Sequence, residues 1–147
     1  MAFWKPGSAK PDVPLTLEVD RGGVEAGGSL VPYNRDENLA LVSQRQRLPI
    51  YKCRDAILYL VETRATTVLV GQTGCGKTTQ VPQFIIEDAI NQNRGGECSV
   101  IVTQPRRLSA MAVAERVANE RNEKIGNTVG YSIRLESKVT KDTRLLF

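Results

Sequence analysis

Residues 68–84 read VLVGQTGCGKTTQVPQF, in which three glycines fall within six residues directly after a β-branched apolar run. The part from Gly71 to Thr78 matches the pattern G-x-x-x-x-G-K-[ST], which is typical of a phosphate-binding loop between a strand and a helix. Glycines allow the backbone dihedrals and the close approach with which successive N–H groups wrap a phosphate chain. Lys77 can reach the β- and γ-phosphates, and the helix N-terminus adds partial positive charge. The stretch therefore predicts a nucleotide-binding loop.

The candidate contacts to the nucleotide are the residues of this loop and of the first helical turn. The hydroxyl of Thr78 is also the candidate Mg²⁺ ligand, and Cys75 is most simply a small residue that fills the loop. Loops of this kind occur in kinases, GTPases, transporters and motors, so the loop alone does not name the function. The candidate contacts are Gly71, Gln72, Thr73, Gly74, Cys75, Gly76, Lys77, Thr78 and Thr79.

The periodicity of apolar residues around the loop predicts an α/β fold. Residues 39–62 suggest two helical pieces broken at Pro49, and Thr66–Val70 has the β-branched composition of a buried strand. Helical periodicity follows the loop and returns at residues 106–121, and the further expected strands are residues 98–103, 129–135 and 143–147. Strands and helices that alternate at this spacing predict a βαβ series with a parallel sheet.

Composition limits the chemistry that the chain can perform. There is no histidine among the 147 residues, which excludes histidine general bases, Ser-His-Asp triads and most zinc sites. No apolar run approaches the roughly 20 residues that span a bilayer, so we expect no membrane association.

Residues 1–38 hold four prolines and five glycines and are expected to be a mostly disordered leader, in which Phe3 and Trp4 are either surface anchors or incidental aromatics. Residues 39–147 hold sixteen basic and ten acidic side chains, a surplus that suits a polyanionic partner.

A second polar segment follows the strand expected at residues 98–103. It contains Thr103, Arg106 and Arg107, and the carboxyl ends of strands form the ligand face of an open α/β sheet. Two guanidiniums and a hydroxyl there could contact the backbone phosphates of an oligonucleotide. The alternative is an ordinary solvated helix start. Arginine is unfavourable beside the positive end of a helix dipole, which favours a functional reason for it.

Three motifs resemble, in order and spacing, the first motor domain of the DEAH-box RNA helicases of superfamily 2. They are GQTGCGKTTQVPQF, TQPRRLSAMAVAERVA and VGYSIRLES, and the resemblance covers Gln44 to Phe147. It implies a P-loop NTPase (RecA-like) three-layer fold with a parallel sheet, of which residues 39–147 would be the incomplete N-terminal part, truncated before the Asp-Glu-Ala-His segment. The leader segment FWKPGS is similar to the start of one spliceosome-associated subgroup of the family.

The resemblance implies ATP and Mg²⁺ at the loop, with Arg116 stacked on the adenine. Without the resemblance, Arg116 would be an ordinary exposed helix arginine. The resemblance also implies contacts to the RNA backbone, without sequence specificity, from Thr103, Arg106, Arg107 and Arg134. It further implies spliceosome components and a glycine-patch protein as partners, and a nuclear location. Gln72 departs from the family, where glutamate is common, on what we expect to be the solvent side of the loop.

The resemblance also sets an expectation about activity. The family's water-activating acidic residues and second motor domain lie beyond Phe147, so we expect no catalytic residue within these 147 residues and negligible intrinsic ATP hydrolysis. In the resembled domain the strand before the loop pairs with later strands, so an unpaired edge and an exposed apolar face are expected here. Two other readings remain open: a small-molecule kinase with the same loop, and a truncated, inactive product that only binds nucleotide or partners.

Overall fold

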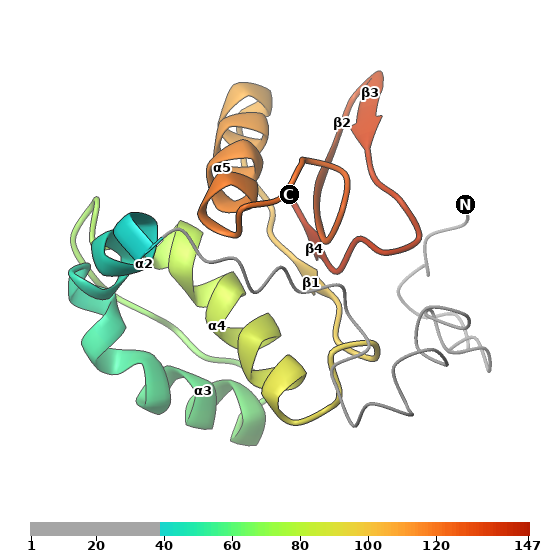
Figure 1. The fold of residues 1–147 in the computed structure, drawn as a ribbon. Helices are drawn as coiled ribbons and strands as arrows, with labels where there is room; N and C mark the ends of the chain where they lie inside the picture. The colour runs from blue at the N-terminus through green and yellow to red at the C-terminus, as the bar shows by residue number, and fades with distance from the viewer. Residues whose placement is uncertain (1–38) are drawn as a thin grey trace.

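Residues 39–147, the part that this computed structural model describes, alternate between helices and short strands (Figure 1). The predictions made for residues 1–38, including the leader and the anchors Phe3 and Trp4, lie outside the described residues. In the described part the helices lie to one side of a small mixed sheet (Figure 1). The α/β class predicted from the sequence is therefore confirmed.

The first ordered segment consists of helices broken where proline predicts a break. α2 (Leu39–Gln46) ends before a 3₁₀ helix, η2 (Pro49–Cys53), which runs directly into α3 (Arg54–Thr63). Pro49 stands at the first position of η2, where its fixed φ and missing N–H cause no loss of a helical hydrogen bond. The predicted break at Pro49 is confirmed.

α4 (Lys77–Asn91) begins at the end of the glycine-rich loop and lies between two apolar clusters. We call the first the helix-side cluster, in which Ile50, Ile57 and Phe84 are buried. In it the Tyr51 ring meets the edge of Phe84 with centroids 5.4 Å apart, and the Arg54 guanidinium lies 5.7 Å from the Phe84 centroid. Because α4 packs against apolar residues on both sides, its first turn is fixed in place and so is the loop that leads into it.

The second cluster, which we call the sheet-side cluster, joins α4 and α5 (Arg107–Glu120) to the sheet. Small residues form the buried face of α5, and Ala114 is fully buried, so the helix can lie close against the sheet. Leu108 is 79% exposed, since the alanine face of α5 and not this leucine turns inward. The buried members of the sheet-side cluster are Ile86, Ile90, Ala110, Ala114, Val117, Ala118, Val129, Tyr131, Leu145 and Phe147.

The sheet has four short strands in the order β1-β4-β2-β3. β1 (Val100–Ile101), β4 (Leu145–Leu146) and β2 (Val129–Ile133) are parallel neighbours, whereas β3 (Glu136–Lys138) pairs antiparallel with β2. The expectation of a wholly parallel sheet is therefore wrong in this respect. The reason is a tight turn after β2, where Leu135 adopts φ 73° and sends the chain straight back.

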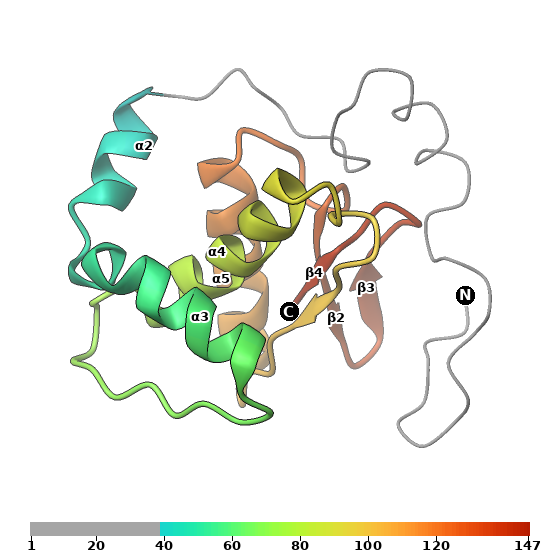
Figure 2. The ribbon, with the colours of Figure 1, turned by 90° about the horizontal axis from the view of Figure 1, so that it is seen from below.

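The strand predicted for Thr66–Val70 is not formed in this structure. The segment is an extended loop between α3 and α4 (Figure 2), and its backbone pairs with none of the described strands. Val68 is 81% exposed and Val70 is 95% exposed. A β-branched run forms a strand only where a neighbouring strand accepts its hydrogen bonds and a packed face covers its side chains. The result is the unpaired apolar segment that the family resemblance led us to expect.

Gly130 marks a point of very close backbone approach within the hairpin that joins β2 to β3. A Cβ placed on Gly130 would lie 2.4 Å from the carbonyl oxygen of Lys138, well inside van der Waals contact. The hairpin is also held by side chains, since the Tyr131 hydroxyl donates a hydrogen bond to the Glu136 carboxylate. That hydrogen bond raises the pKa of the Tyr131 hydroxyl. These contacts set the position of the turn between the two strands, on which Arg134 lies.

Candidate nucleotide site and polyanion-binding pocket

The glycine-rich loop has the backbone conformation that its sequence predicts. Gly74 and Gly76 have φ values of 82° and 101°, in the left-handed region that side chains rarely adopt. A Cβ at Gly76 would also meet Ile50 Cγ2 at 3.0 Å and Leu48 Cδ1 at 3.1 Å. Glycine at position 76 is therefore required both by the dihedral angle and by the packing of the segment that precedes α3.

The ammonium group of Lys77 lies across this loop. Its Nζ donates hydrogen bonds to the carbonyl oxygens of Gly71, at 2.6 Å, and Gln72, at 2.8 Å. It also lies 3.5 Å from the sulfur of Cys75. The side chain of Gln72 is exposed, as we expected for the position where it departs from the family. The loop and its lysine thus form one compact cationic structure on the surface.

The residues of this site fit a nucleoside triphosphate with Mg²⁺. The N-terminus of α4 has no side-chain cap and no acidic residue in its first turn, so its N–H groups and dipole are directed at the loop. Thr79 donates its hydroxyl to the carbonyl of Gly76 at 3.3 Å, whereas the exposed Thr78 hydroxyl has no hydrogen bond within residues 39–147. Thr78 is therefore the hydroxyl that could bind a metal ion, and Thr79 supports the loop.

Arg116 lies on the exposed side of α5, with 53% of its side chain accessible to solvent. Its Nε donates a hydrogen bond of 2.7 Å to Oε1 of Glu120, one helical turn away. This single contact orients the planar guanidinium while much of the group faces solvent. Arg116 is thus well placed to contact a ligand, although its position alone does not identify the ligand.

A buried polar network, which the sequence reasoning missed, lies behind the loop. Glu120, only 6% exposed, accepts hydrogen bonds through Oε2 from Gln80 at 2.9 Å and from Gln83 at 2.7 Å. Arg45 of α2 donates to Oε1 of Gln80 at 2.8 Å and forms an ion pair with Glu87 at 2.7 Å. We call these residues and Arg116 the Glu120 network. The sequence feature that could have predicted this network is the pair Gln80 and Gln83 within an otherwise apolar helix, because buried amides need hydrogen-bond partners.

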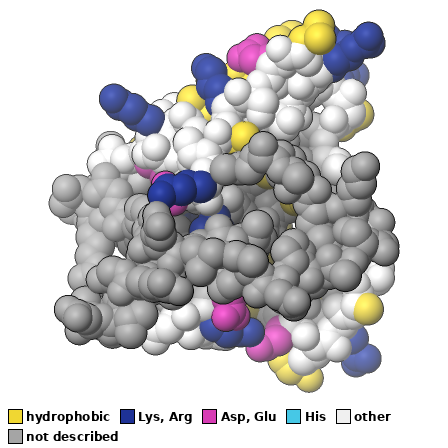
Figure 3. All heavy atoms as spheres, turned by 90° about the vertical axis from the view of Figure 1, so that its right-hand side faces the viewer, with side chains coloured by type: hydrophobic (Ala, Val, Ile, Leu, Met, Phe, Trp, Pro, Cys, Tyr) yellow, Lys and Arg dark blue, Asp and Glu magenta, His cyan; other side chains and the backbone are white. Residues whose placement is uncertain are grey.

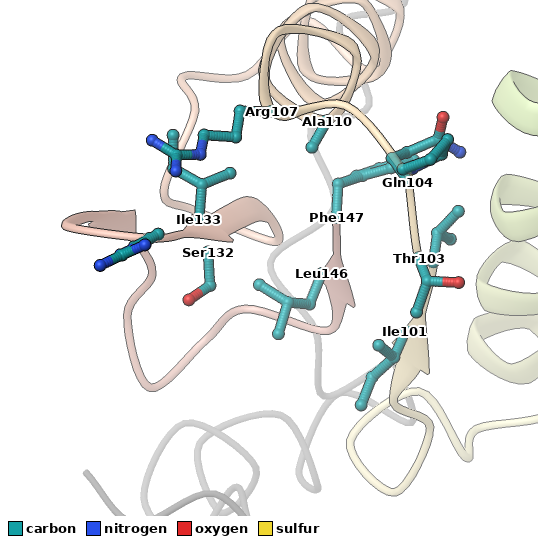
Figure 4. A pocket seen from close by; sticks show the side chains of 12 residues that line it. Ile101, Thr103, Gln104, Arg107, Ala110, Ser132, Ile133, Leu146 and Phe147 are labelled. Atoms are coloured by element: carbon teal, nitrogen blue, oxygen red, sulfur yellow. The ribbon is translucent and has the colours of Figure 1, made fainter.

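The predicted polyanion contacts gather around a pocket at the carboxyl ends of three parallel strands (Figure 4). The pocket has a volume of about 340 Å³, and Thr103, Arg107 and Arg134 lie on its wall. Arg106 precedes α5 and is exposed outside the pocket, so the structure brings together three of the four predicted residues. The lining residues are Ile101, Val102, Thr103, Gln104, Pro105, Arg107, Ala110, Ser132, Ile133, Arg134, Leu146 and Phe147.

The pocket combines an apolar interior with polar groups on opposite sides. Figure 4 shows Arg107 and Ser132 on the side of α5 and β2, and Thr103 and Gln104 on the side of β1. On the face shown in Figure 3, lysine and arginine side chains are scattered over the described part and form no single large patch.

Two further properties of the described residues limit the kinds of site they form. Among residues 39–147 there is no group of three or more cysteine and acidic side chains arranged to hold a metal ion. Within the same range, none of the helices has the length and apolar content that a membrane span requires.

Comparison with known proteins gives a consistent set of relatives, although no family model matches the chain. The "DExH-box ATP-dependent RNA helicase DExH3" of Arabidopsis thaliana is 53% identical over 111 residues, which are 76% of this chain and 9% of that protein. The "RNA editing associated helicase 2" of Trypanosoma brucei brucei is 53% identical over 105 residues, 71% of this chain and 5% of that protein. The human "Probable ATP-dependent RNA helicase DHX35" is 45% identical over 135 residues, 91% of this chain and 18% of that protein.

These matches differ in how far they extend along the chain. The match to the human protein covers 91% of the chain, so it includes part of residues 1–38, from which the subgroup resemblance was drawn. The chain spans no more than 18% of the length of the three relatives described above.

Proposed function

This chain is homologous to the DEAH/DExH-box ATP-dependent RNA helicases, and from that premise we propose that it is the ATP-binding segment of an RNA helicase motor. The motor would couple ATP hydrolysis to the unwinding or remodelling of RNA. The observation that carries the proposal is the conformation of the loop. The Lys77 ammonium donates hydrogen bonds to two loop carbonyl oxygens, and Gly76 adopts a positive φ at the start of α4. In the complete motor this segment would belong to a RecA-like domain.

The loop supplies the phosphate-binding half of the proposed chemistry. The unpaired N–H groups of the first turn of α4 and the Lys77 ammonium would neutralise the triphosphate. Thr78 would hold Mg²⁺, which would neutralise part of the negative charge of the phosphates. Arg116 would lie against the adenine, because an arginine plane stacks on aromatic faces. The half-exposed side chain of Arg116 and its fixed Nε support this role.

The pocket supplies the RNA-binding half. Arg107 and Arg134 would contact backbone phosphates, with the Thr103 hydroxyl as a third donor. Arg106 would contact the same strand from outside the pocket. Such contacts carry no direct base information, so the segment would bind RNA without strong sequence preference. A role in splicing, a nuclear location, and spliceosome or glycine-patch partners are proposals that rest on the resemblance of residues 1–38 to one subgroup.

The proposal is tested by measuring both ligands on the purified chain. We expect binding of ATP in the presence of Mg²⁺, competition by inorganic tripolyphosphate, and similar affinities for single-stranded RNAs of different sequence. A chain that binds ATP but no RNA would favour one of the two alternatives, the small-molecule kinase or the inactive product that only binds nucleotide. Phosphate release stimulated by RNA, measured in a longer polypeptide that contains this segment, would separate a motor from both alternatives.

Substitution of the pocket arginines should weaken RNA binding in a salt-dependent way. Arg107→Ala and Arg134→Ala should each lower the affinity for single-stranded RNA by roughly 3- to 10-fold and reduce the salt slope by about 0.7, as loss of one phosphate contact predicts. Fluorescence anisotropy at several salt concentrations measures both quantities. Arg64→Ala, which removes an exposed arginine at the end of α3, is the matched control. Equal losses in all three variants would contradict a role for the pocket.

A further inference from the structure

Glu120 is a buried carboxylate whose two oxygens both accept hydrogen bonds from side chains of α4 and α5. Oε1 accepts from Arg116 at 2.7 Å, and Oε2 accepts from Gln80 at 2.9 Å and from Gln83 at 2.7 Å. Arg45 adds a second positive charge 3.9 Å from Oε2. A buried carboxylate requires such donors, since an unpaired one would be strongly destabilising. The contact to Arg116 is therefore more ordered than an exposed pair at the same spacing would be.

One path of hydrogen bonds leads from Glu120 to the phosphate loop. Gln80 Nε2, which donates to Glu120, also donates to the hydroxyl of Thr79 at 3.1 Å. That hydroxyl in turn donates to the carbonyl of Gly76 at 3.3 Å. Gln80 also packs against the loop, with its Cγ 3.2 Å from the position of a Cβ on Gly76. The last glycine of the loop and Glu120 are thus joined through two side chains.

The other oxygen of Glu120 holds the only hydrogen bond that the Arg116 side chain makes within residues 39–147. The Nη atoms and the faces of this guanidinium are free of intramolecular hydrogen bonds there, and about half of the side chain faces solvent. An arginine held at Nε alone keeps its planar surface available for stacking. The position of that surface relative to the loop is consequently determined by Glu120.

We propose that Glu120 is a positioning residue that holds Arg116 at a set place relative to the phosphate loop and so strengthens the binding of the nucleotide base. This inference rests on the proposed function, because it assumes that the loop binds a nucleotide. An ordered Arg116 meets the base without first losing rotamer freedom. Loss of that order would cost binding about 0.5–1.5 kcal/mol for one side chain, which is roughly 2- to 10-fold in affinity.

The test compares a ligand that has a base with one that has none. Dissociation constants for ATP, GTP and inorganic tripolyphosphate, each with Mg²⁺, are measured on the 147-residue chain and on Glu120→Gln. We expect Glu120→Gln to weaken the binding of ATP and of GTP about 2- to 10-fold each, because an arginine plane stacks on either purine, and to leave tripolyphosphate binding unchanged. Glu115→Gln makes the same charge change on an exposed residue of the same helix and should change none of these values.

A double-mutant cycle shows whether Glu120 acts through Arg116. Arg116→Ala should weaken ATP binding without affecting tripolyphosphate, and adding Glu120→Gln to it should cause no further loss. If circular dichroism shows that Glu120→Gln does not fold, Glu120→Asp keeps the buried charge but withdraws it from Arg116, and the same ATP-specific loss is expected.

The remaining outcomes overturn the proposal. Equal weakening of ATP and tripolyphosphate would mean that Glu120 only supports the loop, and unchanged ATP affinity would mean that it does not position Arg116. An additive loss in the double variant would mean that Glu120 acts by another route. If the unchanged chain binds neither ATP nor tripolyphosphate, the proposed function itself fails, and this inference fails with it.

Discussion

Replacement of Lys77 by alanine is expected to weaken the binding of ATP with Mg²⁺ by about 10- to 100-fold, from the loss of charge-assisted hydrogen bonds worth roughly 1.5–3 kcal/mol. In the structure the ammonium is already held over the loop by the carbonyl oxygens of Gly71 and Gln72. A phosphate bound in the loop would meet this charge without rearrangement of the lysine backbone. Isothermal titration calorimetry with ATP and with tripolyphosphate measures the effect.

The loss should be the same for ATP and for tripolyphosphate, because Lys77 acts on the phosphates and not on the base. This distinguishes it from the effects expected at Arg116 and Glu120. Lys124→Ala removes an exposed lysine from the turn after α5 and is the matched control, with no change expected. ATP affinity that survives in Lys77→Ala would show that the loop is not the nucleotide site.

Replacement of Gly130 by alanine is expected to lower the free energy of unfolding by about 3 kcal/mol, at the upper end of the usual cost of overpacking. The added Cβ would lie 2.4 Å from the carbonyl oxygen of Lys138. That oxygen belongs to the backbone, so no change of rotamer can relieve the contact and the strands themselves must move apart. Urea unfolding followed by circular dichroism measures the change, and a shift in the midpoint without a change in slope would indicate reduced stability.

Gly74→Ala provides the comparison that separates steric contact from backbone strain. Gly74 has a φ of 82°, and a Cβ there would meet no atom within 4 Å. Its replacement should cost only the roughly 1–2 kcal/mol of a left-handed residue. If Gly130→Ala proves no more destabilising than Gly74→Ala, the close approach of the two strands is not as tight as described.

Most helices of the described part could be predicted because they depend on local rules. The break at Pro49, the start of α4 at the end of the loop, and α5 all follow from proline geometry and helical periodicity. The strands were harder to predict. β1, β2 and β4 lie where apolar runs were found, but β3 is short and polar and its three residues are exposed, so nothing in its composition marks it.

The error at Thr66–Val70 shows the limit of composition. This run has the strongest β-forming composition next to the loop, yet Val68 and Val70 are largely exposed and unpaired with the described strands. Whether a strand forms depends on a neighbouring strand, which can lie anywhere in the chain. The apolar pattern therefore indicated that the segment can form a strand, but it carried no information on whether a neighbouring strand is present.

The candidate site divides in the same way. The sequence by itself determined the conformation of the glycine-rich loop, because its glycines and Lys77 act within a few residues of one another. Only the tertiary structure decided that Arg107 and Arg134 share a pocket, and that Glu120, which holds Arg116, also meets Gln80, 40 residues before it in the chain. A buried carboxylate must find donors wherever the packing of helices brings them, and that packing cannot be read from local periodicity.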